Sequence, residues 1–201
     1  MNEVIIATKN KGKAKEFERM FGSKGMQVKT LLDFPEIPDV EETGSTFEEN
    51  AIIKAEAIAK LMGKMVIADD SGLEVDALEG RPGVYSARYA GAEKNDSANT
   101  EKVLQELAGV PERDRTARFR CVLAVAAPGE KTVVYSGSCE GRILTQPRGT
   151  NGFGYDPVFF VEGKGKTMAE LPPEEKNKIS HRADALKKLE ISLDLGNGEE
   201  L

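Results

Sequence analysis

The fold is decided by the stretch Val4-Ile5-Ile6-Ala7-Thr8-Lys9-Asn10-Lys11-Gly12-Lys13 near the N-terminus. Its first half, Val4–Thr8, is short, apolar and β-branched, and a polar loop follows it, so it predicts a buried strand. A helix is predicted over Lys13–Phe21, because its apolar side chains fall on one side and Gly22 lies near its end. The chain therefore opens with a strand, a polar loop and a helix.

The alternation of strands and helices continues along the chain. Further strands are predicted at Val28–Leu32, Met65–Asp69, Arg118–Ala126, Thr132–Cys139 and Val158–Val161. Further helices are predicted from a capping box at Thr46–Glu49 to about Met62, over Ser97–Ala108 with Asp96 as cap, and over Ser180–Leu193 after a charged segment, Glu174–Lys178. The turn Pro128–Glu130 suggests an antiparallel hairpin. This pattern predicts an α/β fold, with α+β character, around a mixed sheet.

Length and composition narrow the class of protein. With 201 residues, a single domain over 1–201 is expected, with a frayed tail at about 195–201. A chain of this size buries about 70% of its unfolded surface, so it needs no disulfide or structural metal. Cys121 and Cys139 form no CxxC pair and are expected to be reduced core thiols.

Charge and hydropathy exclude other classes. The net charge of -6 and the pI near 5.1 argue against a broad nucleic-acid-binding face. The apolar run at the N-terminus is too short for a signal peptide, and no later run approaches ~18 apolar residues. We therefore expect a soluble, cytoplasmic protein without a membrane or nucleic-acid partner.

The loop Thr8–Lys13 is a candidate anion site. A junction between a strand and a helix exposes backbone donors at the helix N-terminus, and three lysines add positive charge. The loop lacks the Walker pattern GxxxxGK[ST]. A solvated, lysine-rich turn is the alternative interpretation.

The step Asp69-Asp70-Ser71-Gly72 is the sharper signal. It is predicted to end an apolar strand, where α/β folds commonly bind ligands. Side chains alternate along a strand, so one aspartate would enter a site while the other braces the loop. Carboxylates suit Mg²⁺, which usually takes one or two of them plus substrate phosphates. The alternative is an Asx-turn in which Gly72 supplies a positive φ.

Three weaker candidates accompany these two. Glu41–Gly44 is an acidic loop of a kind that is usually solvated, and Lys54 lies off the apolar stripe of its helix, where it faces phosphate or water. In Asn151–Pro157, glycines flank Phe153 as stacking on a flat base would require, although a tight turn whose aromatics belong to the core is the better explanation of the motif alone. His181-Arg182 would lie in the first turn of the last helix if Ser180 caps it.

Together these stretches resemble one family, the inosine triphosphate pyrophosphatases, which sanitise the nucleotide pool. The resemblance runs from Thr8 to Arg182. The matching residues are Thr8, Asn10 and Lys13, Glu42-Thr43-Gly44, Phe47, Asn50, Ala51 and Lys54, Ala68–Leu73, Pro82–Arg88, Gly152–Pro157, and Glu175, Lys176, Ser180, His181 and Arg182. Lys9 departs from the glycine of many relatives, which puts backbone approach to a phosphate there in doubt.

The resemblance implies a reaction and an architecture. It implies Mg²⁺-dependent hydrolysis of ITP, dITP and XTP to the monophosphate and pyrophosphate, which keeps these nucleotides out of DNA and RNA. It also implies an elongated, two-lobed fold around a long mixed sheet, a nucleotide cleft between the lobes, and a homodimer.

The resemblance also implies roles for single residues. Asp70 would be the catalytic carboxylate and a metal ligand, with Glu42 as a second ligand. The residues implied around the triphosphate and sugar are Thr8, Lys9, Asn10, Lys11, Gly12, Lys13, Lys54, Ser71 and Lys176. Phe153 would stack on the base beside Gly154 and Tyr155, and Asp156, His181 and Arg182 would read its edge. Arg88 is a weaker candidate for a contact with the substrate.

Two other functions compete with this interpretation. A Maf-like pyrophosphatase would act on pyrimidine or modified nucleotides, but the Phe153–Asp156 loop and the His181-Arg182 pair count against it. A nucleotide sensor would bind without turnover, yet carboxylates crowded near a triphosphate benefit a binder only if a metal joins them.

Overall fold

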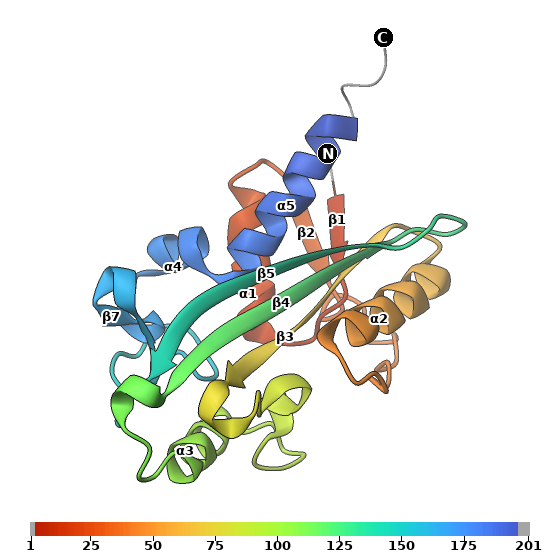
Figure 1. Ribbon diagram of the computed structural model, residues 1–201. Coiled ribbons are helices and arrows are strands. Elements are labelled where there is room, and N and C mark those ends of the chain that lie inside the picture. Colours follow the sequence, from red (N-terminus) through yellow and green to blue (C-terminus); the bar gives the residue numbers. More distant parts are fainter. Residues whose placement is uncertain (1–2, 197–201) are drawn as a thin grey trace. The chain divides into compact units, whose positions relative to one another are not determined.

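The computed structural model describes residues 3–196 (Figure 1). These residues form two compact units. Unit 1 contains residues 3–70, 121–137 and 185–196, and unit 2 contains residues 71–120 and 138–184. The chain passes from unit 1 to unit 2 between Asp70 and Ser71, in the middle of a strand. Most of the tail predicted to fray lies outside the described residues, and its first two residues, 195 and 196, belong to a helix.

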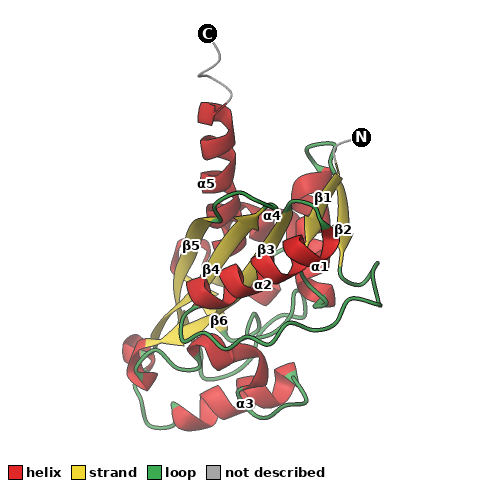
Figure 2. Cartoon of the chain, turned by 90° about the vertical axis from the view of Figure 1, so that its right-hand side faces the viewer, coloured by secondary structure: helices red, strands yellow, loops and turns green. Residues whose placement is uncertain are grey.

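A seven-stranded mixed sheet runs through the chain in the order β2-β1-β3-β4-β5-β6-β7. The strands are β1 (Glu3–Ile6), β2 (Gln27–Thr30), β3 (Val66–Val75), β4 (Thr116–Ala126), β5 (Val133–Ile143), β6 (Phe159–Val161) and β7 (Lys166–Thr167). β1 pairs in parallel with β2 and β3, whereas β6 pairs antiparallel with β5 and β7. Figure 2 shows the strands from β2 to β5 in this order. The predicted α/β fold with a mixed sheet is confirmed.

Unit 1 is built on the parallel strands and two helices, α1 (Lys11–Gly22) and α2 (Phe47–Met62). α1 buries Phe17 and Phe21, whose ring centroids lie 6.2 Å apart. α2 begins after Thr46, which caps it, and ends at Gly63, which has a left-handed backbone with φ 64°. The hairpin between β4 and β5 turns within this unit, as predicted (Figure 1).

One of the two interactions of the predicted capping box at the start of α2 has a different partner from the one expected. The Thr46 hydroxyl accepts a hydrogen bond from the Glu49 amide, as expected. The Glu49 carboxylate, however, accepts from the amide and hydroxyl of Ser45, one residue before the cap. These bonds lower the pKa of Glu49.

Unit 2 has its own hydrophobic core, in which Leu73, Phe119, Tyr155 and Phe159 are buried. Its helices are α3 (Asp96–Glu106), α4 (Pro173–Ile179) and the start of α5 (His181–Gly196). The segment Glu174–Lys178, predicted only as charged chain, therefore lies inside α4. Pro173 at its first position suits a helix start, because proline has no backbone donor to lose there.

The sequence predicted that strand β3 ends at the aspartates, but the strand continues beyond them. It continues through Ser71 and Gly72 to Val75. Gly72 has no positive φ, which excludes the Asx-turn alternative. Glycine is needed at this position for a different reason, which is steric. A Cβ there would lie 2.4 Å from Ser86 Oγ and 2.6 Å from the Gly83 carbonyl oxygen. Gly72 therefore lets the turn at residues 83–86 pack against the strand.

The cap of α3 was also predicted wrongly. Asn95, not Asp96, accepts a hydrogen bond from the Ala98 amide, at 2.9 Å. Asp96 is the first residue of the helix, and its carboxylate binds elsewhere in the chain. Cys121 and Cys139 are buried and form no disulfide within the described residues, as predicted. In residues 3–196 no helix is long and apolar enough to cross a membrane.

Arg115 is a buried cation that holds the end of α3. Its guanidinium donates to the carbonyls of Val110 and Leu107, both at 2.9 Å, and of Leu144 at 3.4 Å. Replacing Arg115 with methionine is expected to lower the free energy of unfolding by about 3 kcal/mol, because these buried carbonyls lose their donor. Circular dichroism should then show the melting temperature falling by roughly 6–12 °C.

Arg113→Met is the matched control for this prediction. Arg113 is exposed, and within the described residues its side chain forms a long ion pair of 3.8 Å with Asp114, so its loss should leave the melting temperature nearly unchanged. Equal melting temperatures for both variants would show that Arg115 contributes no special stability.

Candidate active site

The loop between β1 and α1 is held by its own side chains. The Asn10 side chain accepts a hydrogen bond from the Lys13 amide at 3.0 Å and thereby caps α1. The Asn10 amide donates to the Thr8 hydroxyl at 3.1 Å. The helix begins at Lys11, two residues earlier than predicted, so Gly12 and Lys13 lie in its first turn. The donor end of α1 therefore lies within the predicted anion loop.

Asp69 is the braced member of the aspartate pair. Its side chain is fully buried and forms an ion pair with the Lys13 ammonium. The Cys121 thiol donates to the other carboxylate oxygen of Asp69 at 3.1 Å. These contacts fix Asp69 and Lys13 against each other at the start of α1.

Asp70, the second aspartate of the pair, has a raised pKa. The carboxylate is buried, and this desolvation raises its pKa, while Lys13 and Lys54 lower it to a smaller extent. The charges of Glu42 and Asp69 raise it further. A buried acid with a perturbed pKa next to two cations is typical of catalytic sites.

Glu42 and Lys54 form another ion pair of unit 1. Lys54 also donates to the Asp69 carbonyl oxygen at 3.1 Å, which ties α2 to β3. The loop that carries Glu42 is anchored by the buried Asn50, whose side chain accepts from the Gly44 amide at 2.8 Å. Unit 1 thus brings together Glu42 and Lys54 with the two aspartates.

The remaining lysines of the anion loop are arranged differently. The Lys9 ammonium donates to the Ile37 carbonyl at 2.8 Å and forms an ion pair with the exposed Asp39 at 2.9 Å. Lys11 is exposed in the first turn of α1. Lys9 therefore connects the β1–α1 loop to the acidic loop that follows β2.

The donor set of unit 1 fits a hard cation. Within the described part of the chain, no group of three or more His, Cys, Asp or Glu side chains is placed to hold a metal. Mg²⁺ needs no such cage, since it usually binds one or two carboxylates and completes its shell with waters and substrate phosphates. Glu42 and Asp70 supply two carboxylates, and Glu42 lies close enough to Asp70 for its charge to raise the pKa of Asp70.

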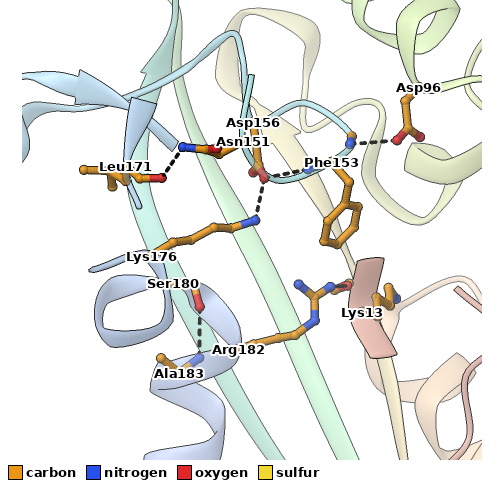
Figure 3. A network of polar contacts seen from close by, with 12 residues as sticks. Lys13, Asp96, Asn151, Phe153, Asp156, Leu171, Lys176, Ser180, Arg182 and Ala183 are labelled. Atoms are coloured by element: carbon orange, nitrogen blue, oxygen red, sulfur yellow. Dashed lines mark hydrogen bonds and ion pairs between the residues drawn. The ribbon is translucent and has the colours of Figure 1, made fainter. Parts of the chain in front are cut away.

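In unit 2 the loop Asn151–Pro157, called the Phe153 loop below, is organised by Asp156 (Figure 3). The buried Asp156 carboxylate accepts from the Phe153 amide at 3.0 Å and forms an ion pair with the buried Lys176. A Cβ on Gly152 would lie 1.9 Å from the same carboxylate. Glycine is therefore required where the loop passes Asp156.

Two cations lie over the Phe153 ring. The Lys176 ammonium is 4.8 Å and the Arg182 guanidinium 5.6 Å from its centroid, within the range of cation–π contacts (Figure 3). Arg182 is buried and also donates to the Ser71 hydroxyl at 2.6 Å. An aromatic ring and buried donors are thus gathered in one place, as recognition of a flat, polar-edged ligand requires.

The predicted neighbours of these residues are also buried. His181 begins α5 and stacks on Phe119, with ring centroids 4.9 Å apart. Ser180 accepts from the Ala183 amide at 3.2 Å, as expected of the cap. Tyr155 lies in the core, and its hydroxyl donates to the Ser86 carbonyl at 2.7 Å.

Comparison with known proteins places this arrangement in a family. The model of the Ham1 family matches residues 4–191. The chain belongs to the Ham1 family.

Ham1-family relatives match the chain over nearly its whole length. A protein of Bacillus licheniformis named dITP/XTP pyrophosphatase is 65% identical over 194 residues, which cover 96% of this chain and 99% of that protein. Its counterpart of the same name in Geobacillus kaustophilus is 63% identical over 190 residues, covering 94% and 93%. The solved structure of the Staphylococcus aureus Ham1 protein is 49% identical, with a TM-score of 0.84 and coverage of 96% and 98%.

The Ham1 site contains residues that sequence reasoning missed. Ser86 accepts from the Leu73 amide at 2.9 Å and so fixes the strand just after the aspartates. Asp96 accepts from the Gly154 amide at 2.8 Å. Ser86 lies in a stretch that matches the family but suggests no role for this residue, and the sequence predicts Asp96 only as a helix cap. No local pattern signals a partner 58 residues away.

Proposed function

We propose that this chain is a nucleoside triphosphate pyrophosphatase that hydrolyses deaminated purine nucleotides, ITP, dITP and XTP, to the monophosphate and pyrophosphate. The names of its close relatives support this reaction. The observation that carries the proposal is the buried Asp70 carboxylate placed with Glu42 between two lysines. Removal of these nucleotides from the pool would keep them out of DNA and RNA.

In this proposal unit 1 holds the triphosphate. Lys13 and Lys54 neutralise phosphate oxygens, and the loop from Thr8 to Gly12 offers backbone donors at the start of α1. Both lysines are already fixed by ion pairs to Asp69 and Glu42, so they are held in place before the substrate arrives. Charge that develops on the leaving pyrophosphate is met by groups that need little rearrangement.

Asp70 has the role of aligning and deprotonating the attacking water. Burial raises its pKa, which makes the carboxylate a stronger base than an exposed aspartate. Glu42 and Asp70 would hold Mg²⁺, which when bound supplies positive charge to the phosphate oxygens. Water would attack the α-phosphorus, and the bond to the bridging oxygen of pyrophosphate would break.

Unit 2 would bind the base. Phe153 provides an aromatic face, the buried cations of Lys176 and Arg182 lie over it, and the buried His181 precedes Arg182 in the chain. Hypoxanthine and xanthine present an oxygen at C6, which accepts hydrogen bonds, whereas adenine presents an amino group that would leave donor facing donor. A site built for one polar edge rejects a misfit by ~10⁴-fold or more. We propose a structural role for Tyr155, because its hydroxyl is bound within the core.

The reaction is tested with purified protein and Mg²⁺ on separate samples of ITP, XTP, ATP, GTP, CTP and UTP. Fast conversion of ITP and XTP to monophosphate plus pyrophosphate, with the standard nucleotides spared, is the expected result. Turnover of pyrimidine nucleotides would favour the Maf-like alternative, and binding without turnover would favour a sensor. Diphosphate plus phosphate would contradict the proposed bond cleavage.

Replacing Glu42 with glutamine should raise the Mg²⁺ concentration needed for half-maximal activity by roughly tenfold or more, because a charged oxygen ligand becomes a neutral amide. The measurement is a magnesium titration of ITP turnover. Glu41→Gln is the matched control, since Glu41 is the exposed neighbour in the same loop. Identical titrations for the two variants would exclude Glu42 as a ligand.

We also propose that the protein is a cytoplasmic homodimer. The dimer rests on the family resemblance alone, and the location on the composition of the sequence. Light scattering coupled to size-exclusion chromatography distinguishes a dimer from the 21.8 kDa monomer.

A further inference from the structure

The Phe153 loop is held from outside by one carboxylate of α3. The Gly154 amide donates to Asp96 Oδ2 at 2.8 Å (Figure 3). We propose that Asp96 is a positioning residue that keeps Phe153 in place for the purine base. This inference rests on the proposed function, and it concerns how the base half of the site is built.

The loop has little backbone stiffness of its own. Gly152 and Gly154 both have left-handed backbones, with φ of 78° and 61°, and they flank Phe153. Glycine loses more conformational freedom than any other residue when it is fixed in a fold. The orientation of Phe153 therefore depends on contacts that other residues make with the loop backbone.

Packing behind the loop is incomplete. A cavity of about 440 Å³ lies between the loop and α3, and Leu104, Pro147, Phe153 and Pro157 are among the residues that line it. Atoms that face an open space have no packing contacts on that side. Its position on this side is thus determined by discrete hydrogen bonds.

Two hydrogen bonds cross from α3 to the loop, and they differ in strength. The Thr100 hydroxyl lies 3.5 Å from the Gly154 carbonyl, at the limit of a hydrogen bond. The bond to Asp96 is short and has a charged acceptor, a combination that is roughly twice as strong as a neutral bond. Asp96 is therefore the main tether of the loop to α3.

The Asp96 carboxylate is not needed as the N-terminal cap of α3. Asn95 already caps α3 by accepting from the Ala98 amide. The Asp96 carboxylate instead accepts from a residue 58 positions further along the chain. On the other side of the loop, Asp156 accepts from the Phe153 amide. Successive amides of the loop are thus held by two carboxylates from different elements.

The test compares three variants. Asp96→Ala removes the acceptor, whereas Asp96→Asn keeps an oxygen at the same position. Glu101→Ala removes an exposed acid from the same helix that lines the same cavity and whose carboxylate accepts a hydrogen bond from Gln105 of that helix. Steady-state kinetics with ITP, thermal unfolding, and hydrogen–deuterium exchange of residues 152–156 are measured for each.

Asp96→Ala is expected to raise KM for ITP about tenfold, since one charge-assisted hydrogen bond is lost, with kcat changed less than about twofold. Amide exchange in residues 152–156 should be faster than in Glu101→Ala, at a similar melting temperature, and Asp96→Asn should restore most of the wild-type KM. Equal KM and equal exchange in the two alanine variants would overturn the proposal. So would an Asp96→Asn variant as impaired as Asp96→Ala in both KM and exchange, because a hydrogen-bond acceptor at this position would then not hold the loop.

Failure of the proposed function gives a different result. In that case the wild-type protein does not convert ITP to IMP and pyrophosphate. The exchange measurement needs no turnover, so it still decides whether Asp96 holds the loop. An active wild type with an unaffected Asp96→Ala variant would reject the positioning role alone.

Discussion

Replacing Asp70 with asparagine is expected to lower kcat for ITP by roughly three orders of magnitude, because the variant loses a general base. Asparagine has nearly the same shape as aspartate, so the strand keeps its packing. Because burial raises the pKa of Asp70, folding disfavours its ionised form. Removing the charge relieves that cost, and the melting temperature should stay the same or rise.

Asp76→Asn is the matched control for this experiment. Asp76 follows the same strand but is exposed, and its carboxylate binds Arg118 at 2.9 Å. Its loss should leave kcat unchanged. Turnover and thermal unfolding are measured for both variants. Wild-type activity in Asp70→Asn would remove Asp70 from the mechanism, and a large fall in its melting temperature would make lost activity a folding defect.

Strand β3 shows where local sequence patterns predict less than the structure reveals. The apolar run before Asp69 predicts a strand, but the polar residues that follow suggest that it ends. The strand continues because β4 lies beside it and because Ser86 binds the Leu73 amide. Both partners come from distant parts of the chain. A polar stretch inside a strand is tolerated where its partners are supplied by the fold.

The site divides in the same way. Features that depend on neighbours in sequence were predictable, such as the Thr46 cap and the glycines around Phe153. Contacts between distant residues were not, among them Lys13 with Asp69 and Gly154 with Asp96. Sequence motifs therefore identified the chemical groups, but their precise partners required the fold.

The second large effect is expected from Gly152→Ala. A Cβ at this position would lie 1.9 Å from Asp156 Oδ2, and φ is 78°, where alanine is strained. The carboxylate that binds Lys176 and the Phe153 amide would have to move. Combined overpacking and strain of about 3 kcal/mol predicts a fall in kcat/KM for ITP of roughly a hundredfold.

Two other glycines of unit 2 separate these causes. Gly154 also has a positive φ, of 61°, but a Cβ there meets nothing within 4 Å, so Gly154→Ala measures backbone strain alone. Gly163 has open space and is not among the positive-φ glycines, so Gly163→Ala should behave as wild type. Kinetics with ITP should rank the losses as Gly152, Gly154 and Gly163. Inhibition by tripolyphosphate should change little in any variant, because the phosphates are assigned to unit 1. An equal loss in Gly152→Ala and Gly154→Ala would mean that strain, and not displacement of Asp156, disables the base site.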